Sequence, residues 1–232
     1  MTATSVDALL FVALPYMAFA LFFVGTILRY RARPFTYSSL SSQFLENKHH
    51  FWAQVPFHYG ILVVLAGHVL AFLLPRAILS WNAAPLRLYL LEITGLAFAT
   101  LALVGMVNIV ARRLGDDRSR VTTTATDWVV YALLLTQIGT GISTAVSYPW
   151  GSSWFSVVLA PYLWSLATFS PDPVPLSAMP FLVKMHVVGL WVILGFFPFT
   201  RLVHVLVVPN PYLWRRPQVV RWHGIGRFAR RS

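Results

Sequence analysis

Five long apolar stretches dominate the hydropathy pattern of this chain. Each has about 20 residues or more, which matches the roughly 17 to 25 residues that a helix needs to cross a bilayer. The pattern therefore predicts five transmembrane helices, at about residues 6–28, 53–74, 86–111, 126–148 and 180–207. We expect an all-α fold, a polytopic membrane helix bundle. The sequence shows neither an internal repeat nor a segment suited to a soluble domain.

A sixth apolar segment, residues 150–169, departs from this pattern because Pro161 interrupts it. A crossing there would place the arginine-rich C-terminal tail on the side opposite the other basic loops, against the charge asymmetry of membrane proteins. Trp150, Trp154 and Trp164 are typical of a membrane–water interface. We expect an interfacial segment on the outer face, and a sixth span remains the alternative.

The basic residues predict how the bundle is oriented. Of the 18 Lys and Arg residues, 15 fall on one side of the predicted spans, and only Arg76, Arg87 and Lys184 fall on the other. Because Lys and Arg concentrate on the cytoplasmic side, we expect the N-terminus outside and the C-terminus in the cytoplasm. No Lys or Arg precedes Arg29, so the first span lacks the positive region of a cleaved signal peptide and should remain as a helix.

The predicted spans and the charge divide the chain into two parts. Residues 1–208 form the five-helix membrane domain, and residues 209–232 form a basic cytoplasmic tail that we expect to dock a partner subunit. The net charge of +11 would also suit nucleic acid, but a nucleic-acid-binding protein would not distribute its charge between apolar spans.

Composition mainly limits the cofactors that the chain can hold. The residues are 57% hydrophobic and the mean hydropathy is +0.67, which is too apolar for a soluble domain. There is no cysteine, so the chain cannot hold a Cys-ligated iron–sulfur cluster, a thioether-linked haem or a disulfide. Any redox cofactor must therefore be held by histidine.

Four of the seven histidines lie within the predicted spans: His58 and His68 in the second, and His186 and His204 in the fifth. Ionisable side chains at membrane depth are costly and usually functional. A single histidine there could serve only in helix packing. Four histidines on two helices favour a shared cofactor. The other three histidines lie in basic cytoplasmic segments, and we assign them no ligand role.

The spacing of these histidines predicts two pairs. His186 and His204 are about five helical turns and 27 Å apart on one face of an ideal helix, whereas His58 and His68 are about 15 Å apart and about 80° out of alignment. Tilt or local distortion must absorb that mismatch. Because the two helices run antiparallel, His58 should meet His204 near the cytoplasmic face, and His68 should meet His186 near the outer face.

Two b-type haems, each held between two imidazoles, fit this spacing. Bis-imidazole ligation fills both axial positions of the iron and suits electron transfer. The separations exclude one metal cluster of four histidines, whose ligands must lie within about 5 Å of one another. Two other interpretations remain open: a transporter with a histidine proton relay and no haem, and a passive membrane anchor. Glycines Gly60, Gly67 and Gly189 are consistent with either haem clearance or helix packing.

Other polar residues have candidate roles beside the histidines. Arg201 shares a helical face with His204, so it could bind a propionate of the inner haem. Arg120 and the following threonines start the fourth helix, where they could cap it or hydrogen-bond to the inner haem. Glu92 lies inside the third span, where it could pair with Arg87 or accept a proton.

Several short motifs give the chain a resemblance to a known family. They are Leu28-Arg29-Tyr30, Ser41-Ser42-Gln43, Phe57-His58-Tyr59-Gly60-Ile61-Leu62, Gly67-His68, Arg120 with Thr122-Thr123-Thr124 and Asp127, His186-Val187-Val188-Gly189, and Phe197-Pro198-Phe199-Thr200-Arg201-Leu202-Val203-His204. Over nearly its whole length the chain resembles the gamma subunit of membrane-bound respiratory nitrate reductase, a quinol-oxidising di-haem cytochrome b of the inner (plasma) membrane.

The resemblance implies five helices, two haem b groups held by the histidine pairs above, and quinol oxidation beside the outer haem. It also implies cytoplasmic partners: an iron–sulfur beta subunit that receives the electrons, and a molybdenum alpha subunit that reduces nitrate. The same type of haem subunit could instead serve another molybdenum oxidoreductase. The family's quinol-site lysine near the start of the third helix has no lysine counterpart here. Our candidate quinol site is therefore Gly67, His68 and Arg87, the nearest cation.

Overall fold

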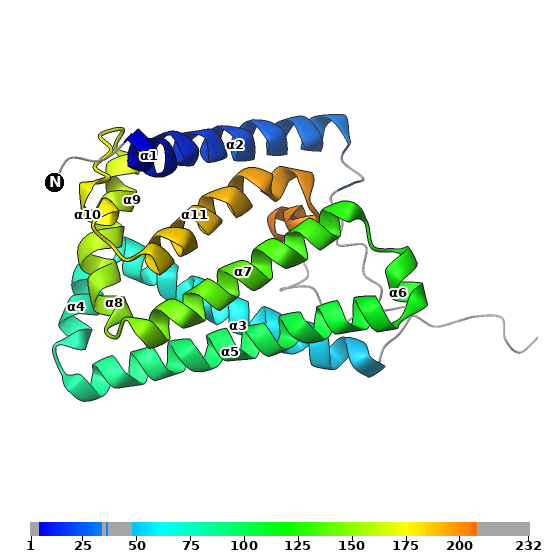
Figure 1. Cartoon of the computed structure of the whole chain (residues 1–232), viewed down its shortest axis with the longest axis horizontal. Helices are drawn as coiled ribbons and strands as arrows, with labels where there is room; N and C mark the ends of the chain where they lie inside the picture. The colour runs from blue at the N-terminus through cyan, green and yellow to red at the C-terminus, as the bar shows by residue number, and fades with distance from the viewer. Residues whose placement is uncertain (1–4, 34–35, 37–47, 208–232) are drawn as a thin grey trace, which may run out of the picture.

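The structure is a computed structural model, and it describes residues 5–33, 36 and 48–207. Five of its helices are long and apolar enough to cross a membrane, which confirms the predicted number of spans (Figure 1). They are Ser5–Ala32, Trp52–Leu73, Pro85–Gly115, Ala125–Ser147 and Phe181–Phe199. No strand occurs among the described residues, so the fold is all-α as expected.

The helices follow one another with short connections. The first span comprises α1 (Ser5–Ala8), the π-helical η1 (Leu9–Ala13) and α2 (Leu14–Ala32). The middle of the chain forms α3 (Lys48–Leu73), α4 (Pro75–Asn82), α5 (Pro85–Gly115), α6 (Asp117–Val121) and α7 (Ala125–Ser147). The last part forms α8 (Gly151–Trp154), η3 (Phe155–Leu159), α9 (Ala160–Ala167), α10 (Val174–Ser177), α11 (Phe181–Phe196), η4 (Phe197–Phe199) and η5 (Arg201–Val207).

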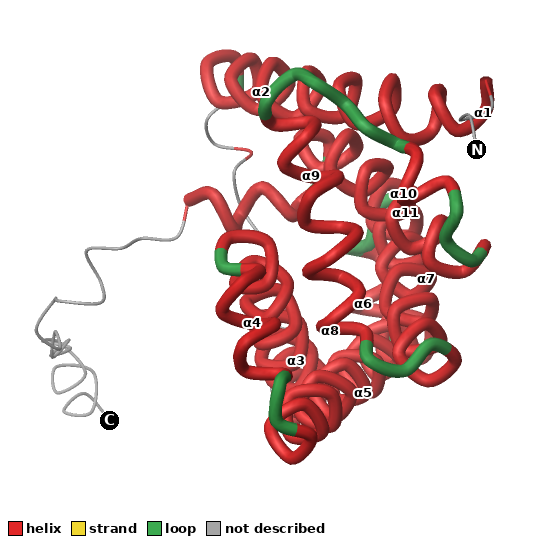
Figure 2. Tube along the Cα trace, turned by 90° about the vertical axis from the view of Figure 1, so that its left-hand side faces the viewer, coloured by secondary structure: helices red, strands yellow, loops and turns green. Residues whose placement is uncertain are grey.

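The bundle has two halves that meet at α7. In one half, α3 packs along α5 and α5 packs on α7; in the other, α11 packs between α7 and α2 (Figures 1 and 2). Each half has its own buried apolar cluster. Within the described chain, α3 and α11 do not pack closely on each other. The two helices that carry the intramembrane histidines therefore face each other across a gap between the halves.

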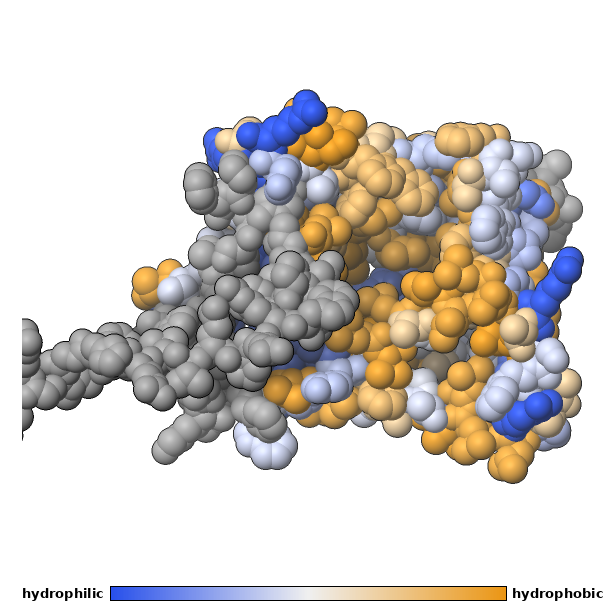
Figure 3. All heavy atoms as spheres, turned by 180° about the vertical axis from the view of Figure 1, so that it is seen from behind, coloured by the Kyte–Doolittle hydropathy of each residue, from blue (hydrophilic) through white to orange (hydrophobic). Residues whose placement is uncertain are grey.

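The outer surface is suited to lipid. Large apolar side chains are exposed along α2, α3 and α5. Seen from behind, the molecule is mostly apolar and is hollowed near its middle, where hydrophilic atoms lie deeper (Figure 3). An apolar exterior around a more polar interior is the expected distribution for a protein whose solvent is the bilayer.

The segment 150–169 lies across one end of the bundle and is not a sixth span (Figure 1). Its helices α8 and α9 run roughly at right angles to the spans. The buried phenol of Tyr162 donates to the carbonyl of Phe11, at 2.9 Å, and the Trp164 indole donates to the carbonyl of Phe72, at 3.0 Å. This end segment is thus bonded to both the first and the second span.

The fifth span is not the continuous helix that we predicted over residues 180–207. The α-helix ends at Phe196, η4 is a 3₁₀ turn, and Thr200 is extended with φ −113° and ψ 175° before η5 begins. Pro198 is the physical reason, because its ring clashes with the preceding turn and it has no N–H to donate. The predicted five-turn alignment of His186 and His204 on one straight helix was therefore wrong.

The side chain of Arg29, at the end of α2, holds this break in place. Its Nη1 donates to the carbonyls of Pro198 and Thr200, at 2.7 Å each. These carbonyls lie where the regular hydrogen bonding of the helix stops. One turn earlier, a Cβ added at Gly25 would lie only 3.0 Å from the Cβ of Pro198, so the absence of a side chain there lets η4 approach α2 closely. The end of α2 is therefore shaped to receive the break.

Replacing Arg29 should destabilise the protein more than replacing a neighbouring arginine. We expect Arg29→Ala to lower the free energy of unfolding by about 2–3 kcal/mol, because one hydrogen bond to a charged group contributes about 1.5–3 kcal/mol. The control is Arg31→Ala on the same helix, where the side chain is exposed. Thermal unfolding in detergent micelles measures both variants. Equal melting temperatures for the two would contradict this role of Arg29.

Candidate functional site

The four intramembrane histidines come together as two separate pairs. The ring centroids of His58 and His204 are 6.5 Å apart with an interplanar angle of 64°. Those of His68 and His186 are 6.4 Å apart with an angle of 42°. These are the pairs that the sequence predicts. No group of three or more potential metal ligands occurs within the described residues, so the pairs do not merge into one cluster.

The separation within each pair fits one metal ion between two imidazoles. An imidazole nitrogen binds a metal at about 2.0–2.1 Å and lies about 1 Å from its ring centroid, so two opposed ligands have centroids roughly 6–6.5 Å apart. Both observed distances, 6.5 and 6.4 Å, agree with this value. Direct imidazole stacking or a hydrogen bond between the rings would draw them closer. The donor set therefore fits a bis-imidazole haem at each pair.

Hydrogen bonds within their own segments fix three of the four rings. Nδ1 of His58 lies 2.8 Å from the carbonyl of Gln54, and Nδ1 of His68 lies 2.8 Å from the carbonyl of Val64. Nδ1 of His204 lies 2.7 Å from the carbonyl of Arg201. A carbonyl only accepts, so each Nδ1 carries the proton. In each case Nε2 keeps its lone pair for a metal.

His186 is oriented instead by side chains of α7. Its Nδ1 lies 3.1 Å from the hydroxyl of Thr140, and its Nε2 lies 3.5 Å from the amide nitrogen of Gln137. The Gln137 amide also donates to the carbonyl of His186, at 3.1 Å. The sequence analysis did not identify Gln137 or Thr140. The available signal was their polar character inside an apolar span.

The break in the fifth span explains how both pairs form despite the angular mismatch on α3. The second span is one continuous α-helix from His58 to His68, so these side chains remain about 80° apart around its axis. His186 lies on α11, whereas His204 lies beyond the break, on η5. The local distortion that the sequence required is therefore on the fifth span, not on the second.

The glycines that we considered for haem clearance divide into two groups. A Cβ at Gly60 would lie 2.5 Å from the backbone nitrogen of Ala102, so Gly60 serves the close packing of α3 on α5. The reciprocal contact is at Gly105, where a Cβ would lie 2.3 Å from the backbone nitrogen of Phe57. Nothing lies within 4 Å of a Cβ at Gly67, so Gly67 is not a packing glycine.

The residues near the inner pair are mainly bonded to each other. Arg201 Nη2 lies 3.2 Å from the Asp127 carboxylate and donates to the carbonyl of Thr122, at 3.0 Å. Thr124 and Asp127 form a capping box at the start of α7, as the capping interpretation predicts. The Arg120 side chain is exposed. Binding of a haem propionate by Arg201 or Arg120 stays a prediction.

The expected pairing of Glu92 with Arg87 was wrong. Oε1 of Glu92 accepts from the backbone N–H and the hydroxyl of Ser152, at 2.8 and 2.6 Å, because α8 lies against the start of α5. The Arg87 guanidinium lies over the Trp81 ring at 5.4 Å and donates to the carbonyl of Ser80, at 3.3 Å. The i, i+5 spacing does not bring the two side chains together.

The candidate quinol site is only partly assembled by the described contacts. The His68 ring contacts the Phe155 ring edge to face at 5.5 Å, a neighbour that the sequence did not reveal. No contact printed among residues 48–207 joins Arg87 to Gly67 or His68. The role of Arg87 therefore stays a prediction. The tail over residues 209–232, expected to dock a partner, lies outside the described residues.

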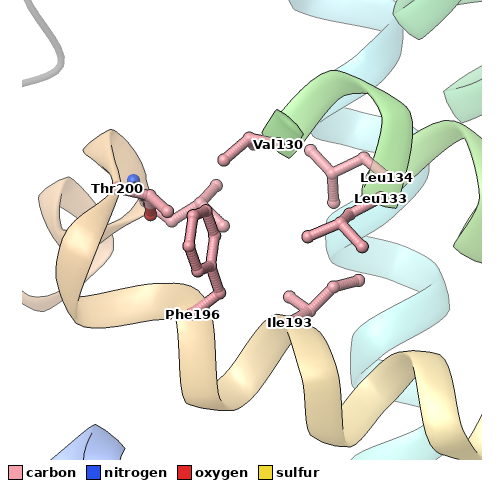
Figure 4. A pocket seen from close by; sticks show the side chains of 7 residues that line it. Val130, Leu133, Leu134, Ile193, Phe196 and Thr200 are labelled. Carbon is pink, nitrogen blue, oxygen red and sulfur yellow. Dashed lines mark hydrogen bonds between the residues drawn. The ribbon is translucent and has the colours of Figure 1, made fainter. Parts of the chain in front are cut away.

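A small apolar pocket lies between α7 and the end of the fifth span, with an empty volume of about 180 Å³ (Figure 4). It is lined by Val130, Leu133, Leu134, Ile193, Phe196, Thr200 and Leu202. Its only polar lining residue is a threonine, and none of the four histidines contributes to it. The pocket therefore offers no chemistry of its own, and the histidine pairs are the candidate site.

Comparisons with known proteins agree with this arrangement. The sequence profile of the family described as nitrate reductase gamma subunit matches residues 7–223. The chain is 34% identical over 214 residues to the respiratory nitrate reductase 2 gamma chain of Escherichia coli K12, covering 89% of this chain and 93% of that one. It is 31% identical over 211 residues to the nitrate reductase gamma chain of Bacillus subtilis 168, covering 90% and 95% respectively.

The glycine contact between α3 and α5 yields a test of the scaffold beneath the inner pair. We expect Gly105→Ala to lower the free energy of unfolding by about 1–3 kcal/mol, the usual cost of overpacking, because the new methyl group meets the backbone at Phe57. Gly95→Ala on the same helix has open space and should leave stability unchanged or slightly raised. Thermal unfolding compares them. If Gly105→Ala is as stable as Gly95→Ala, the proposed close contact is absent.

Proposed function

Because the chain belongs to the nitrate reductase gamma subunit family, we propose that it is the membrane cytochrome b subunit of a respiratory nitrate reductase, oxidising quinol at the cell's inner (plasma) membrane. The observation that carries this proposal is the spacing of the two histidine pairs, 6.5 and 6.4 Å between ring centroids, inside apolar spans. A proton-relay transporter would need histidines close enough for hydrogen bonding, and a passive anchor would need no paired imidazoles.

The residues of each pair would hold one haem b. His58 and His204 would bind the inner iron, and His68 and His186 the outer iron, through the Nε2 atoms that their hydrogen bonds leave available. Two such haems supply one-electron transfer across the membrane without an open coordination position. Arg201 has guanidinium N–H groups beyond the Nη2 that binds Asp127 and Thr122, and these would serve an inner propionate.

Quinol would be oxidised at the end of the bundle that carries His68 and the crossing segment α8–α9. Gly67 leaves open space beside His68, where a flat ring can approach the backbone. Arg87 starts α5 at the same end of the bundle and provides a cation for a quinol oxygen. With this end outside, as the charge distribution predicts, the protons released from quinol enter the outer compartment.

The electrons would leave at the opposite, cytoplasmic end. Membership of this family implies association with other nitrate reductase subunits. We propose an iron–sulfur beta subunit docked near His204 and on the basic tail, and a molybdenum alpha subunit in which nitrate is reduced. The subunits that co-purify with the chain decide between nitrate reductase and another molybdenum oxidoreductase.

Haem content of the purified protein tests the ligand pairs directly. We expect a pyridine haemochrome assay to give two haems b per chain, and His68→Ala and His204→Ala to give one each, because an iron that loses one axial imidazole is held too weakly. His50→Ala, a histidine to which we assign no ligand role, is the control and should retain two. A colourless wild-type protein would favour the proton relay and reject this proposal.

Steady-state kinetics of quinol oxidation by the assembled complex test Arg87. We expect Arg87→Ala to raise KM for quinol by about 10-fold or more with haem content unchanged, since a hydrogen bond from a charged group contributes about 1.5–3 kcal/mol. Arg76→Ala, which removes an exposed arginine from α4 at the same end, is the matched control. The same KM in both variants would show that Arg87 does not contact quinol.

A further inference from the structure

We propose that Thr140 and Gln137 of α7 form a positioning site for His186, which gives the outer histidine pair a ligand environment that the inner pair lacks. The inference rests on the proposed function, because it assigns these residues to a haem ligand. The site lies where α7 packs on α11. It would set the electronic properties of one haem without touching the other.

The hydroxyl of Thr140 can only accept from His186. Its proton is directed to backbone carbonyls of its own helix, those of Thr136 at 2.8 Å and Gln137 at 3.1 Å. The His186 Nδ1, 3.1 Å away, must therefore be the donor. Thr140 is 8% exposed, so water does not compete readily for this bond. The contact selects the tautomer that leaves Nε2 of His186 unprotonated.

Gln137 leads to the same tautomer by an independent contact. Its amide group donates to the His186 carbonyl, which fixes the amide nitrogen on the side of the imidazole. A nitrogen donor 3.5 Å from Nε2 requires Nε2 to be an acceptor. Gly189 provides the space for this side chain, because a Cβ there would lie 2.2 Å from Oε1 of Gln137. The amide cannot be reversed without setting two carbonyl oxygens against each other.

The imidazole is also confined sterically. A Cβ at Gly141 would lie 2.9 Å from Cε1 of His186, so the ring lies directly on the backbone of α7. The rings of His58, His68 and His204 are each bonded to a carbonyl within their own segment. Among the four histidines, His186 is the one whose ring is oriented by side chains of another helix, and its position depends on the packing of α7 on α11.

A hydrogen bond from Nδ1–H strengthens an imidazole as a ligand, because it shifts electron density toward Nε2. A stronger donor favours the ferric over the ferrous state and so lowers the reduction potential. Removing the acceptor at Thr140 should therefore make the outer haem easier to reduce. The inner haem has no contact with Thr140 through its own ligands and should be unaffected.

The test compares Thr140→Val, Thr140→Ser and Thr136→Val in the purified protein. Thr136 is one turn away on the same helix and is exposed, so it matches the chemical change without the histidine contact. Redox titration of the haem absorbance and electron paramagnetic resonance of the ferric protein are the readouts. We expect Thr140→Val to move one midpoint potential to a more positive value and to shift one low-spin signal. Thr140→Ser and Thr136→Val should match the wild type. His68→Ala identifies the affected haem as the outer one.

The outcomes separate this inference from the proposed function. Loss of only the outer haem in Thr140→Val, with two haems retained in Thr140→Ser, also supports the positioning role. Unchanged potentials and spectra in Thr140→Val, equal shifts of both haems, or the same shift in Thr136→Val would overturn the inference alone. Fewer than two haems in the wild-type protein would overturn the proposed function and the inference with it.

Discussion

The contact between Arg29 and the break in the fifth span is the constraint on which the site depends. Two histidines ten residues apart on an unbroken α3 cannot face two histidines aligned on a second unbroken helix. The turn at Pro198 releases His204 from alignment with His186, and the two pairs can then form. Such a break leaves carbonyls without helical partners inside the protein, which is costly unless another group binds them. Arg29 binds two of them, so the first span stabilises the geometry of the fifth.

The separation of the histidine helices has a related physical basis. Each of them is held by another neighbour: α3 lies against α5 through Gly60 and Gly105, and α11 lies between α2 and α7. The gap between the pairs is thus set by contacts elsewhere in the bundle, not by the histidines. A scaffold of this kind is suited to holding flat cofactors, because the ligands are positioned before anything binds between them.

The outer end of the bundle is built differently from the inner end. There the crossing segment is bonded to α5 through Glu92 and Ser152, to α4 through Asn82 and to α3 through Trp164. The same segment places Phe155 against His68. Helix packing, polar bonds and an aromatic contact therefore all converge near the outer pair, where we propose that quinol is oxidised. A carboxylate such as Glu92 is tolerated at that depth because Ser152 donates to it twice.

The sequence by itself determined the five spans, the two histidine pairs and the interfacial character of residues 150–169. These follow from the thickness of the bilayer, helical periodicity and the placement of arginine and tryptophan, which are all local or additive properties. Only the tertiary structure decided that the fifth span breaks, that Gly60 is a packing glycine, that Glu92 binds Ser152 and that Thr140 orients His186. These are choices among partners 40 or more residues away in the chain, and no local pattern distinguishes one partner from another. The physical reason is that a polar group in an apolar span must find some partner, whereas which one it finds depends on how the helices pack.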